Sequence, residues 1–489
     1  MNSTERPSCR PGPLRTVLHL DGVGRRVAHL MGILLVVAGL AACSRDRPRF
    51  GATPPIVLIA VDGLEWNVML PLLAKGDLPV MARLMEAGTF GYLASMRPTK
   101  SPVIWTSVAT GKTPQKHGIT NFFYVADAEG KPEVRLFTSG HRSTKAFWDI
   151  LSDYGLVVHC LGWWISYPAE PINGVMVSQT NTTPLAGVRG QPVAKGSLLK
   201  GIEGQVHPPR RYDEMMTILD EVDSSLPEIT QKIFGSPAHP PDAFSLMMWT
   251  ESLWAFRADA TYLSIARRLL ASKEPFDLIA VYIGGTDVVG HRFWRYAYPA
   301  SFQHPPSSDQ IENYGHIIDD YYRYSDQAIG ELLKPLPPDT TVLIVSDHGI
   351  HASNQNREFR PDDSPSFTHS GDHDDAPPGV FIAAGWGIRA AAPPGIRPAN
   401  FSAHSLDTVG SVLDITPTIL ALKGIPIGED MDGTPLRQVV TPRVLEARPI
   451  RFIASHDTET WLAQRDSYKK IPVDQAQRLE QLRALGYIR

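Results

Sequence analysis

The chain has 489 residues, of which 43% are hydrophobic and 20% charged, and its formal net charge is −4 at neutral pH. This length allows one large α/β domain with an insertion, or two domains. The sequence has no basic excess, which argues against a nucleic-acid-binding surface, and its three cysteines are too few for a disulfide framework or a four-thiolate zinc site.

The N-terminal segment predicts export and lipid attachment. Arg25 and Arg26 precede the apolar run Leu30–Cys43, which is shorter than the roughly 20 apolar residues that a membrane span requires. Such a run, with small residues at its end, is typical of a secretory signal peptide. Its last four residues, Leu-Ala-Ala-Cys, resemble a bacterial lipobox, and this resemblance implies cleavage before Cys43 and lipidation of that cysteine.

We therefore expect residues 1–43 to be a lipoprotein signal peptide and residues 44–53 to be a tether. Ser44 follows the cysteine, with no Asp at that position to indicate retention at the inner membrane. The body would then be exported and lipid-anchored to the bacterial envelope, at the outer membrane and facing the periplasm, because several acyl chains anchor a protein stably where one does not. A plain signal-anchor helix is the alternative.

Three apolar runs end in acids or histidines: Ile56–Asp62, Leu278–His291 and Val342–His348. Long apolar runs bounded by glycine are typical of strands that are buried on both faces, as in a parallel sheet. In open α/β sheets the ligand lies beyond the carboxyl ends of the strands. The acids and histidines are therefore predicted to converge at one edge of the sheet, where they would form a metal site.

Strands of this kind alternate with amphipathic helices, which predicts an α/β fold with a mostly parallel central sheet flanked by helices. The catalytic domain is expected in two parts, 54–178 and 273–440. Between them, at 179–272, the strand runs stop and Pro, Gly and charged residues become more frequent, so we interpret this segment as an inserted cap subdomain that covers the site from one side. Residues 441–489 would form a C-terminal extension with a helical tail, and Ile311–Leu333 is predicted to be one long helix.

Four segments supply carboxylates and imidazoles that suit Zn²⁺, with Mn²⁺ as an alternative. The candidate metal ligands are Asp62, Asp287, His291, Asp347, His348 and His373. Asp287 and His291 are four residues apart and therefore lie on one face of a helical turn. His373 is favoured over its neighbours His351 and His369 because it most closely precedes the next predicted strand. These ligands exceed the number that a single tetrahedral site takes, so two divalent metal ions are expected.

A candidate nucleophile, Ser101, follows Lys100 and precedes a helical stretch that starts at Val103. A hydroxyl near a helix N-terminus, and any anion bound there, lies at the positive end of the helix dipole. The pKa of a serine hydroxyl is too high for attack at neutral pH, and direct coordination to a metal ion would lower it. A serine that only caps the helix is the alternative.

Together these segments resemble the alkaline phosphatase superfamily, and within it the type I phosphodiesterase/nucleotide pyrophosphatase branch. The resemblance extends over about residues 56–436, with the segments in the family's order. The stretch Pro98–Ile119 is similar to the family's nucleophile segment, and Ser101 falls where the family carries its Thr or Ser nucleophile. The stretches Asp287–His291 and Ser346–Gly349 are similar to two of its metal motifs. Four separated motifs that agree are far more specific than any one alone.

The resemblance implies two metal sites and a covalent mechanism. One metal ion would be held by Asp287, His291 and His373. The other would be held by Asp62, Ser101, Asp347 and His348. The serine would attack phosphorus to form a phosphoserine, which water would hydrolyse. The implied function is that of a metal-dependent phosphoric ester hydrolase, a phosphodiesterase or pyrophosphatase that acts on a small-molecule or envelope phosphoester.

The sequence departs from the family's pattern beside the nucleophile. The branch is expected to carry an Asn three residues after the nucleophile, where this chain has Ile104, and Lys100 is the candidate for binding substrate in its place. Diester or monoester preference is therefore open, and a phosphomonoesterase or an envelope phosphotransferase remain alternatives. A sulfatase is disfavoured because Ser101–Trp105 lacks the Arg of the sulfatase motif. A lipoprotein that keeps the fold without catalysis is disfavoured by the intact ligand set.

Overall fold

The structure is a computed structural model whose described residues fall within the unit Phe50–Arg489. They are residues 53–128, 131–179, 198–353, 370–390 and 402–468. The predicted signal peptide, the lipidation site Cys43 and the tether up to residue 52 lie outside them. Among the described helices there is none with the length and apolar character needed to cross a membrane.

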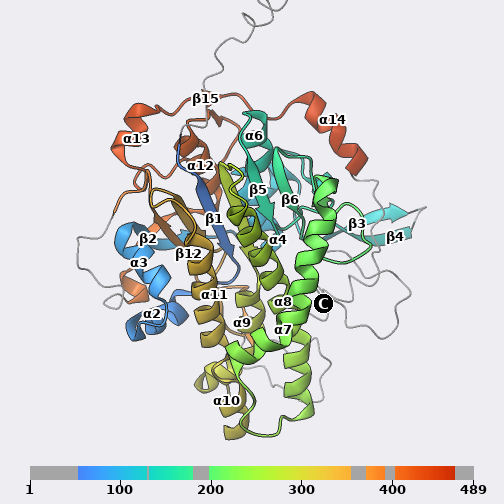
Figure 1. The fold of residues 1–489 in the computed structure, drawn as a ribbon, viewed down its shortest axis with the longest axis vertical. Helices are drawn as coiled ribbons and strands as arrows, with labels where there is room; N and C mark the ends of the chain where they lie inside the picture. Colours follow the sequence, from blue (N-terminus) through green and yellow to red (C-terminus); the bar gives the residue numbers. More distant parts are fainter. Residues whose placement is uncertain (1–52, 129–130, 180–197, 354–369, 391–401, 469–489) are drawn as a thin grey trace, which may run out of the picture. The chain divides into compact units, whose positions relative to one another are not determined.

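A nine-stranded sheet forms the centre of this unit, in the order β13-β2-β12-β9-β1-β8-β5-β6-β7 (Figure 1). Its strands are β1 (Ile56–Val61), β2 (Thr89–Ala94), β5 (Val158–Leu161), β6 (Gly174–Val177), β7 (Val206–His207), β8 (Leu278–Ile283), β9 (Thr341–Val345), β12 (Gly379–Ala384) and β13 (Thr408–Ser411). The five strands from β9 to β6 are parallel to one another, and β13 is parallel to β2. Only β12 and β7 run antiparallel to their neighbours in the described sheet. The predicted mostly parallel sheet is therefore confirmed.

Side chains of β1 alternate between two hydrophobic cores, one on each face of the sheet. Alternate residues from Val57 to Val61 belong to one core, and those from Ile56 to Ala60 belong to the other. Burying a large aliphatic side chain stabilises the fold by about 1.5–3 kcal/mol. A shift of one residue would exchange the two sets, so burial on both faces fixes the position of this strand.

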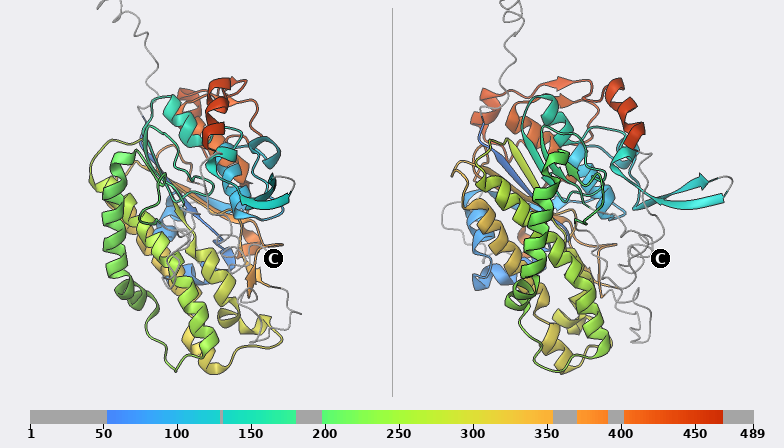
Figure 2. Two further views of the ribbon diagram at one scale, coloured as in Figure 1. Left: turned by 90° about the vertical axis from the view of Figure 1, so that its right-hand side faces the viewer. Right: turned by 45° about the vertical axis from the view of Figure 1, so that its right-hand side comes forward.

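Helices cover both faces of the sheet (Figure 2). The first core is lined by α2 (Trp66–Lys75), α3 (Pro79–Ala87), α7 (Tyr212–Phe234), α8 (Ala243–Ala271), α9 (Gly285–Ala297) and α11 (Ile317–Leu333). The second core is lined by α4 (Ser101–Thr110), α6 (Phe147–Asp153) and α12 (Ile415–Lys423). The predicted flanking of the sheet by helices is thus confirmed.

The remaining helices and strands are short. The helices are α5 (Pro114–His117), α10 (Ser308–Tyr314), α13 (Pro442–Ala447) and α14 (Glu459–Tyr468). The short strand pairs are β3–β4 (Phe123–Ala128 and Lys131–Leu136), β10–β11 (His351–Ala352 and Gly371–Asp372) and β14–β15 (Ile427–Gly428 and Phe452–Ile453). The β3–β4 hairpin projects from the rest of the fold (Figure 2).

The segment interpreted as a cap is continuous with the catalytic core in its described part, 198–272. Its strand β7 extends the central sheet beyond β6. Its helices α7 and α8 contribute buried residues to the first core, together with β1 and α9. That this segment covers the site from one side stays a prediction.

The prediction of one long helix over Ile311–Leu333 is wrong. Helix α10 ends at Tyr314 and α11 begins at Ile317. The break falls at Gly315, and glycine is a poor helix former. A Cβ at this position would lie only 3.0 Å from the carbonyl oxygen of Tyr296, so glycine lets the chain pass close to the end of α9.

Candidate active site

The carboxyl ends of β8, β1 and β9 bring three acids to one edge of the sheet. Strand β1 lies between β8 and β9 and is parallel to both. Asp62 directly follows β1, Asp347 lies two residues beyond β9, and Asp287 lies in the first turn of α9, which follows β8. These acids come from distant parts of the chain, and the parallel topology is what places them together.

Asp62, Asp347 and His348 form a buried group that we call the Asp62 cluster. Each of these residues offers one ligand atom, and the three atoms lie within 4.8 Å of one another. His348 Nε2 lies 3.2 Å from Asp347 Oδ2 and 3.5 Å from Asp62 Oδ1. Its other ring nitrogen, Nδ1, lies 3.0 Å from the carbonyl oxygen of Gly349. A proton on Nδ1 leaves the Nε2 lone pair directed at the two carboxylates, the orientation of a metal-ligating imidazole.

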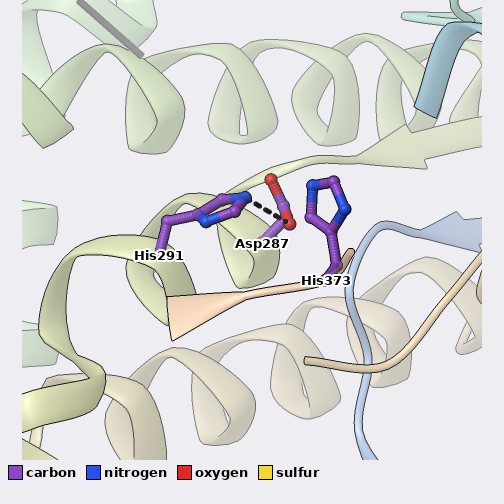
Figure 3. Close-up of side chains that lie close together, drawn as sticks. All are labelled: Asp287, His291 and His373. Atoms are coloured by element: carbon purple, nitrogen blue, oxygen red, sulfur yellow. Dashed lines mark ion pairs between the residues drawn. The ribbon is translucent and has the colours of Figure 1, made fainter. Parts of the chain in front are cut away.

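Asp287, His291 and His373 form a second group, the Asp287 cluster (Figure 3). His291 Nε2 lies 3.3 Å from Asp287 Oδ1, and His291 Nδ1 lies 2.8 Å from the carbonyl oxygen of Gly371. The four-residue spacing on α9 therefore places both side chains on one face, as predicted from the sequence. The carbonyl of Gly371 orients the imidazole in the same way as Gly349 orients its counterpart in the Asp62 cluster.

The alternatives considered for His373 lie elsewhere. His351 is in β10, where it pairs with Asp372, and it belongs to neither cluster. His369 lies outside the described residues. A third group consists of Asp372, His373 and Asp374. In this group Asp372 Oδ1 already accepts hydrogen bonds from the backbone N–H groups of the next two residues.

The two clusters lie side by side. The rings of His348 and His373, one from each cluster, stack with their centroids 4.2 Å apart. The turn after Asp62 makes this close approach possible, because a Cβ at Gly63 would lie 3.0 Å from the Cα of Asp287. Gly63 also has a φ of +64°, which side-chain-bearing residues rarely adopt.

The donor set fits divalent cations. All three carboxyl groups are at most 1% exposed. Burial raises the pKa of Asp62 and raises that of Asp347 well above its usual range, and repulsion from the neighbouring carboxylates adds to both shifts. Asp62 Oδ1, Asp347 Oδ2 and His348 Nε2 make no hydrogen bond to any described residue. Buried acids that repel one another in this way are stable as anions only beside positive charge, and bound metal ions would supply it.

Ser101 belongs to a segment that contacts both clusters. It is the first residue of α4, it is fully buried, and its Oγ has no hydrogen-bond partner among the described residues. Two residues earlier, Thr99 Oγ1 donates to the carbonyl oxygen of His373, and four residues later, Trp105 Nε1 donates to Asp62 Oδ2 at 3.0 Å. The segment that carries the hydroxyl is therefore attached to both clusters.

Two residues near the candidate nucleophile Ser101 have very different surroundings. Ile104 is fully buried in the second hydrophobic core, where an amide side chain would be surrounded by apolar groups. An amide that lies beside Lys100 is that of Asn121, whose Oδ1 accepts hydrogen bonds from Lys100 Nζ at 3.2 Å and from the Phe122 backbone at 2.9 Å. The choice between diester and monoester substrates therefore stays open.

Two buried carboxyl groups behind the ligands were not identified from the sequence. Asp259 of α8 accepts hydrogen bonds from the backbone N–H groups of Gly284 and Gly285, each at 2.9 Å, and from the hydroxyl of Tyr321. It therefore caps α9, whose own N-cap residue is a glycine. Burial raises the pKa of Asp259 to about 6. The segment predicted to be a cap thus helps to position the helix that carries the Asp287 cluster.

Glu65 supports the Asp62 cluster from the other side. It is fully buried, and burial raises its pKa to about 7. Its Oε1 accepts hydrogen bonds from the backbone and side chain of Asn67, and its Oε2 accepts one from the backbone of Ile350. The last contact holds the loop that follows His348. No local motif distinguishes Glu65 or Asp259 from an ordinary surface acid.

His117, the last residue of α5, is expected to make the fold sensitive to acid. It is fully buried, its Nδ1 accepts a hydrogen bond from the backbone of Ile119 at 3.1 Å, and its Nε2 lies 3.0 Å from Ser107 Oγ. Burial, with nearby Arg142, lowers the pKa of His117 to about 3. Because the unfolded chain takes up this proton near pH 6.5 and the folded chain does not, stability should fall as pH decreases from 6.5, by about 3 kcal/mol at about pH 4.5.

Urea denaturation of the metal-free protein at about pH 7.5 and about pH 4.5 measures this effect. His117→Asn keeps an acceptor near the Nδ1 position but has no proton to gain. The change in its unfolding free energy between the two pH values should therefore be smaller than that of the wild type by about 3 kcal/mol. Equal pH dependence in the two proteins would contradict the assignment. His159, whose pKa is lowered by burial to about 4, is present in both proteins and cancels in the comparison.

Comparison with known proteins identifies the family. The family model described as type I phosphodiesterase / nucleotide pyrophosphatase matches residues 56–402, well over half of the chain. A search of curated proteins found no match.

Solved structures with a similar chain include two hydrolases. One is phosphonoacetate hydrolase from Sinorhizobium meliloti 1021 in complex with phosphonoformate, at 15% identity and a TM-score of 0.35, covering 62% of this chain and 58% of that chain. The chain thus matches less than two thirds of that enzyme's length. Another is the 2-O GAG sulfatase BT1596, at 14% identity and a TM-score of 0.46, covering 83% of this chain and 76% of that chain.

The family match covers most of the region over which the sequence motifs resemble the same branch, and it includes every residue of both clusters as well as Ser101. The chain therefore belongs to the type I phosphodiesterase/nucleotide pyrophosphatase family, whose members are hydrolases of phosphoester bonds.

Proposed function

We propose that the protein is a metal-dependent phosphoric ester hydrolase that cleaves phosphodiester or pyrophosphate bonds through Ser101. The observation that carries this proposal is the position of the Ser101 hydroxyl, buried at the N-terminus of α4 in a segment attached to both clusters. Membership of the family supports the reaction class.

The two clusters supply the ligands for a pair of cations. Asp287, His291 and His373 would hold one of them. Asp62, Asp347 and His348, with Ser101, would hold the other. Imidazole and carboxylate ligands suit Zn²⁺, with Mn²⁺ as the alternative. Such ions lower the pKa of a coordinated hydroxyl and neutralise the charge of a bound phosphoryl group.

The chain's own groups then position the reaction. Ser101 Oγ forms a bond to phosphorus as the bond to the leaving oxygen breaks, and water later displaces the serine from the same phosphorus. The N-terminus of α4 stabilises the negative charge of the phosphoryl group. The Lys100 ammonium group, held by Asn121 at 3.2 Å, adds positive charge at the entrance to this helix.

Chromogenic phosphodiesters and phosphomonoesters, assayed with the chelated protein before and after return of Zn²⁺ or Mn²⁺, test the proposal. We expect hydrolysis that depends on the added metal and that is faster for diesters. Product analysis with and without an alcohol acceptor separates hydrolysis from phosphotransfer, because both share the covalent step on Ser101. Absence of turnover of every ester in the presence of metal would contradict the proposed function.

A further inference from the structure

The two oxygens of the Asp62 carboxylate have different surroundings. Oδ2 accepts hydrogen bonds from the Tyr282 hydroxyl at 2.6 Å and from Trp105 Nε1 at 3.0 Å. Oδ1 lies 3.5 Å from His348 Nε2 and makes no hydrogen bond to a described residue. Two donors on one oxygen fix the rotation of the carboxylate, so the other oxygen keeps a constant direction toward the rest of the cluster.

The direction of these hydrogen bonds follows from the donors. Trp164 Nε1 can only donate, and it lies 2.9 Å from the Tyr282 hydroxyl oxygen. The single proton of that hydroxyl is then available for Asp62. The hydrogen bonds therefore form a series in which Trp164 donates to Tyr282 and Tyr282 donates to the carboxylate. Hydrogen bonds in series polarise one another, which strengthens the last of them.

The aromatic rings that carry these donors are packed against one another. The ring of Tyr282 meets that of Trp105 edge to face at 5.7 Å between centroids and that of Trp164 at 6.4 Å. All three side chains belong to the second hydrophobic core. Packing in this core limits the rotation of each ring and therefore the direction of each donor.

A strained turn presents the indole of Trp164. The next residue, Ile165, is buried and has a φ of +56°, a conformation that β-branched residues rarely adopt. The turn is held by Ser166, whose Oγ donates to the carbonyl oxygen of Trp163 and accepts from the backbone of Gln179. In well-packed folds, residues with a strained backbone are found mostly at functional sites. Ile165 is such a residue, and it is adjacent to Trp164, the first donor in the series of hydrogen bonds.

We propose that Tyr282 is a positioning residue for the Asp62 cluster: oriented by Trp164, and together with Trp105, it holds Asp62 so that Oδ1 alone faces the bound cation. Partners that orient metal ligands in this way typically change metal affinity by about 10–100-fold when removed. The proposal rests on the two-cation site of the proposed function. A purely structural role for the hydroxyl would lower stability without distinguishing one cluster from the other.

Tyr282→Phe, which deletes only the hydroxyl, tests the proposal when each cluster is titrated alone. The metal-free protein is titrated with Zn²⁺ in an Asp287→Asn background, which leaves the Asp62 cluster, and in an Asp347→Asn background, which leaves the Asp287 cluster. Tyr296→Phe is the matched control, because Tyr296 is also buried and its hydroxyl contacts Ser245 outside both clusters.

We expect Tyr282→Phe to weaken Zn²⁺ binding by about 10–100-fold in the first background and to leave the second unchanged, with Tyr296→Phe altering neither. Trp164→Phe should produce a smaller loss of Zn²⁺ affinity. This loss should disappear when Tyr282 is already Phe, since Trp164 acts on Asp62 through the Tyr282 hydroxyl. Unchanged affinity in the first background, or equal losses in both, would overturn the proposal. Failure of both backgrounds to bind Zn²⁺ with Tyr282 intact would overturn the proposed function as well.

Discussion

Ser101→Ala should reduce phosphoester turnover by about 10³-fold or more while both cations stay bound. The variant loses the hydroxyl that we propose to form a bond to phosphorus, but it keeps every carboxylate and imidazole of the two clusters. Because Ser101 Oγ has no hydrogen-bond partner among the described residues, its removal should hardly change stability. Steady-state kinetics, metal content and thermal unfolding together measure the three effects.

Thr106→Ala is the matched control for this variant. Thr106 is on the same helix and is also buried, but its hydroxyl donates to the carbonyl oxygen of Pro102 and contacts no cluster. It should keep its turnover within a few-fold and lose at most about 1 kcal/mol of stability. Ser101→Thr retains a hydroxyl and should retain measurable turnover. Wild-type rates in Ser101→Ala would exclude the serine as nucleophile.

Asp347→Asn should have opposite effects on activity and on the stability of the metal-free protein. The side chain is fully buried, and an amide of the same size can keep the hydrogen bond that Oδ1 accepts from the Gly63 backbone at 3.3 Å. Loss of the negative charge should remove one bound cation and reduce turnover by about 10³-fold. It also relieves the repulsion with Asp62 and Asp287, so the metal-free variant should unfold with a free energy about 1–3 kcal/mol higher than that of the metal-free wild type.

Metal analysis measures the loss of one bound cation, and urea denaturation in the presence of a chelator measures the increase in unfolding free energy. Asp339→Asn is a suitable control, since Asp339 is an exposed acid that precedes the same strand, β9, at its other end. It should bind two cations and keep its stability. If Asp347→Asn also bound two cations, or if it destabilised the metal-free protein, the crowding of charge in the Asp62 cluster would not be the origin of its metal affinity.

The parts of the site that could be predicted from sequence are those with a local signature. The strands before Asp62 and Asp347 are uninterrupted apolar runs because both faces of the sheet are covered by helices. Acids at their carboxyl ends must then meet if the strands are parallel neighbours. The four-residue spacing of Asp287 and His291 likewise places both side chains on one face of a helix, whatever the rest of the fold is.

Other parts depend on packing between distant segments. Strand β2 alternates between buried and half-buried residues, and β7 has only two residues, so neither has the apolar run of a central strand. Asp259 acts on α9 from a different helix, and Asn121 meets Lys100 only in the folded chain. The burial of Ile104 in the second hydrophobic core could not be predicted for the same reason, because counting along a helix does not reveal which of its faces packs against the sheet.

The central claim is that the Ser101 hydroxyl attacks phosphorus beside two cation-binding clusters. Acid quenching during turnover, followed by mass spectrometry of the tryptic peptide Ser101–Lys112, measures this most directly. The account predicts a peptide heavier by the transferred phosphoryl group together with the substituent that stays attached to phosphorus, with the modification on Ser101, that disappears as substrate is exhausted. A peptide that remains unmodified throughout turnover in the metal-loaded protein, when the quench is faster than the reaction, would contradict it.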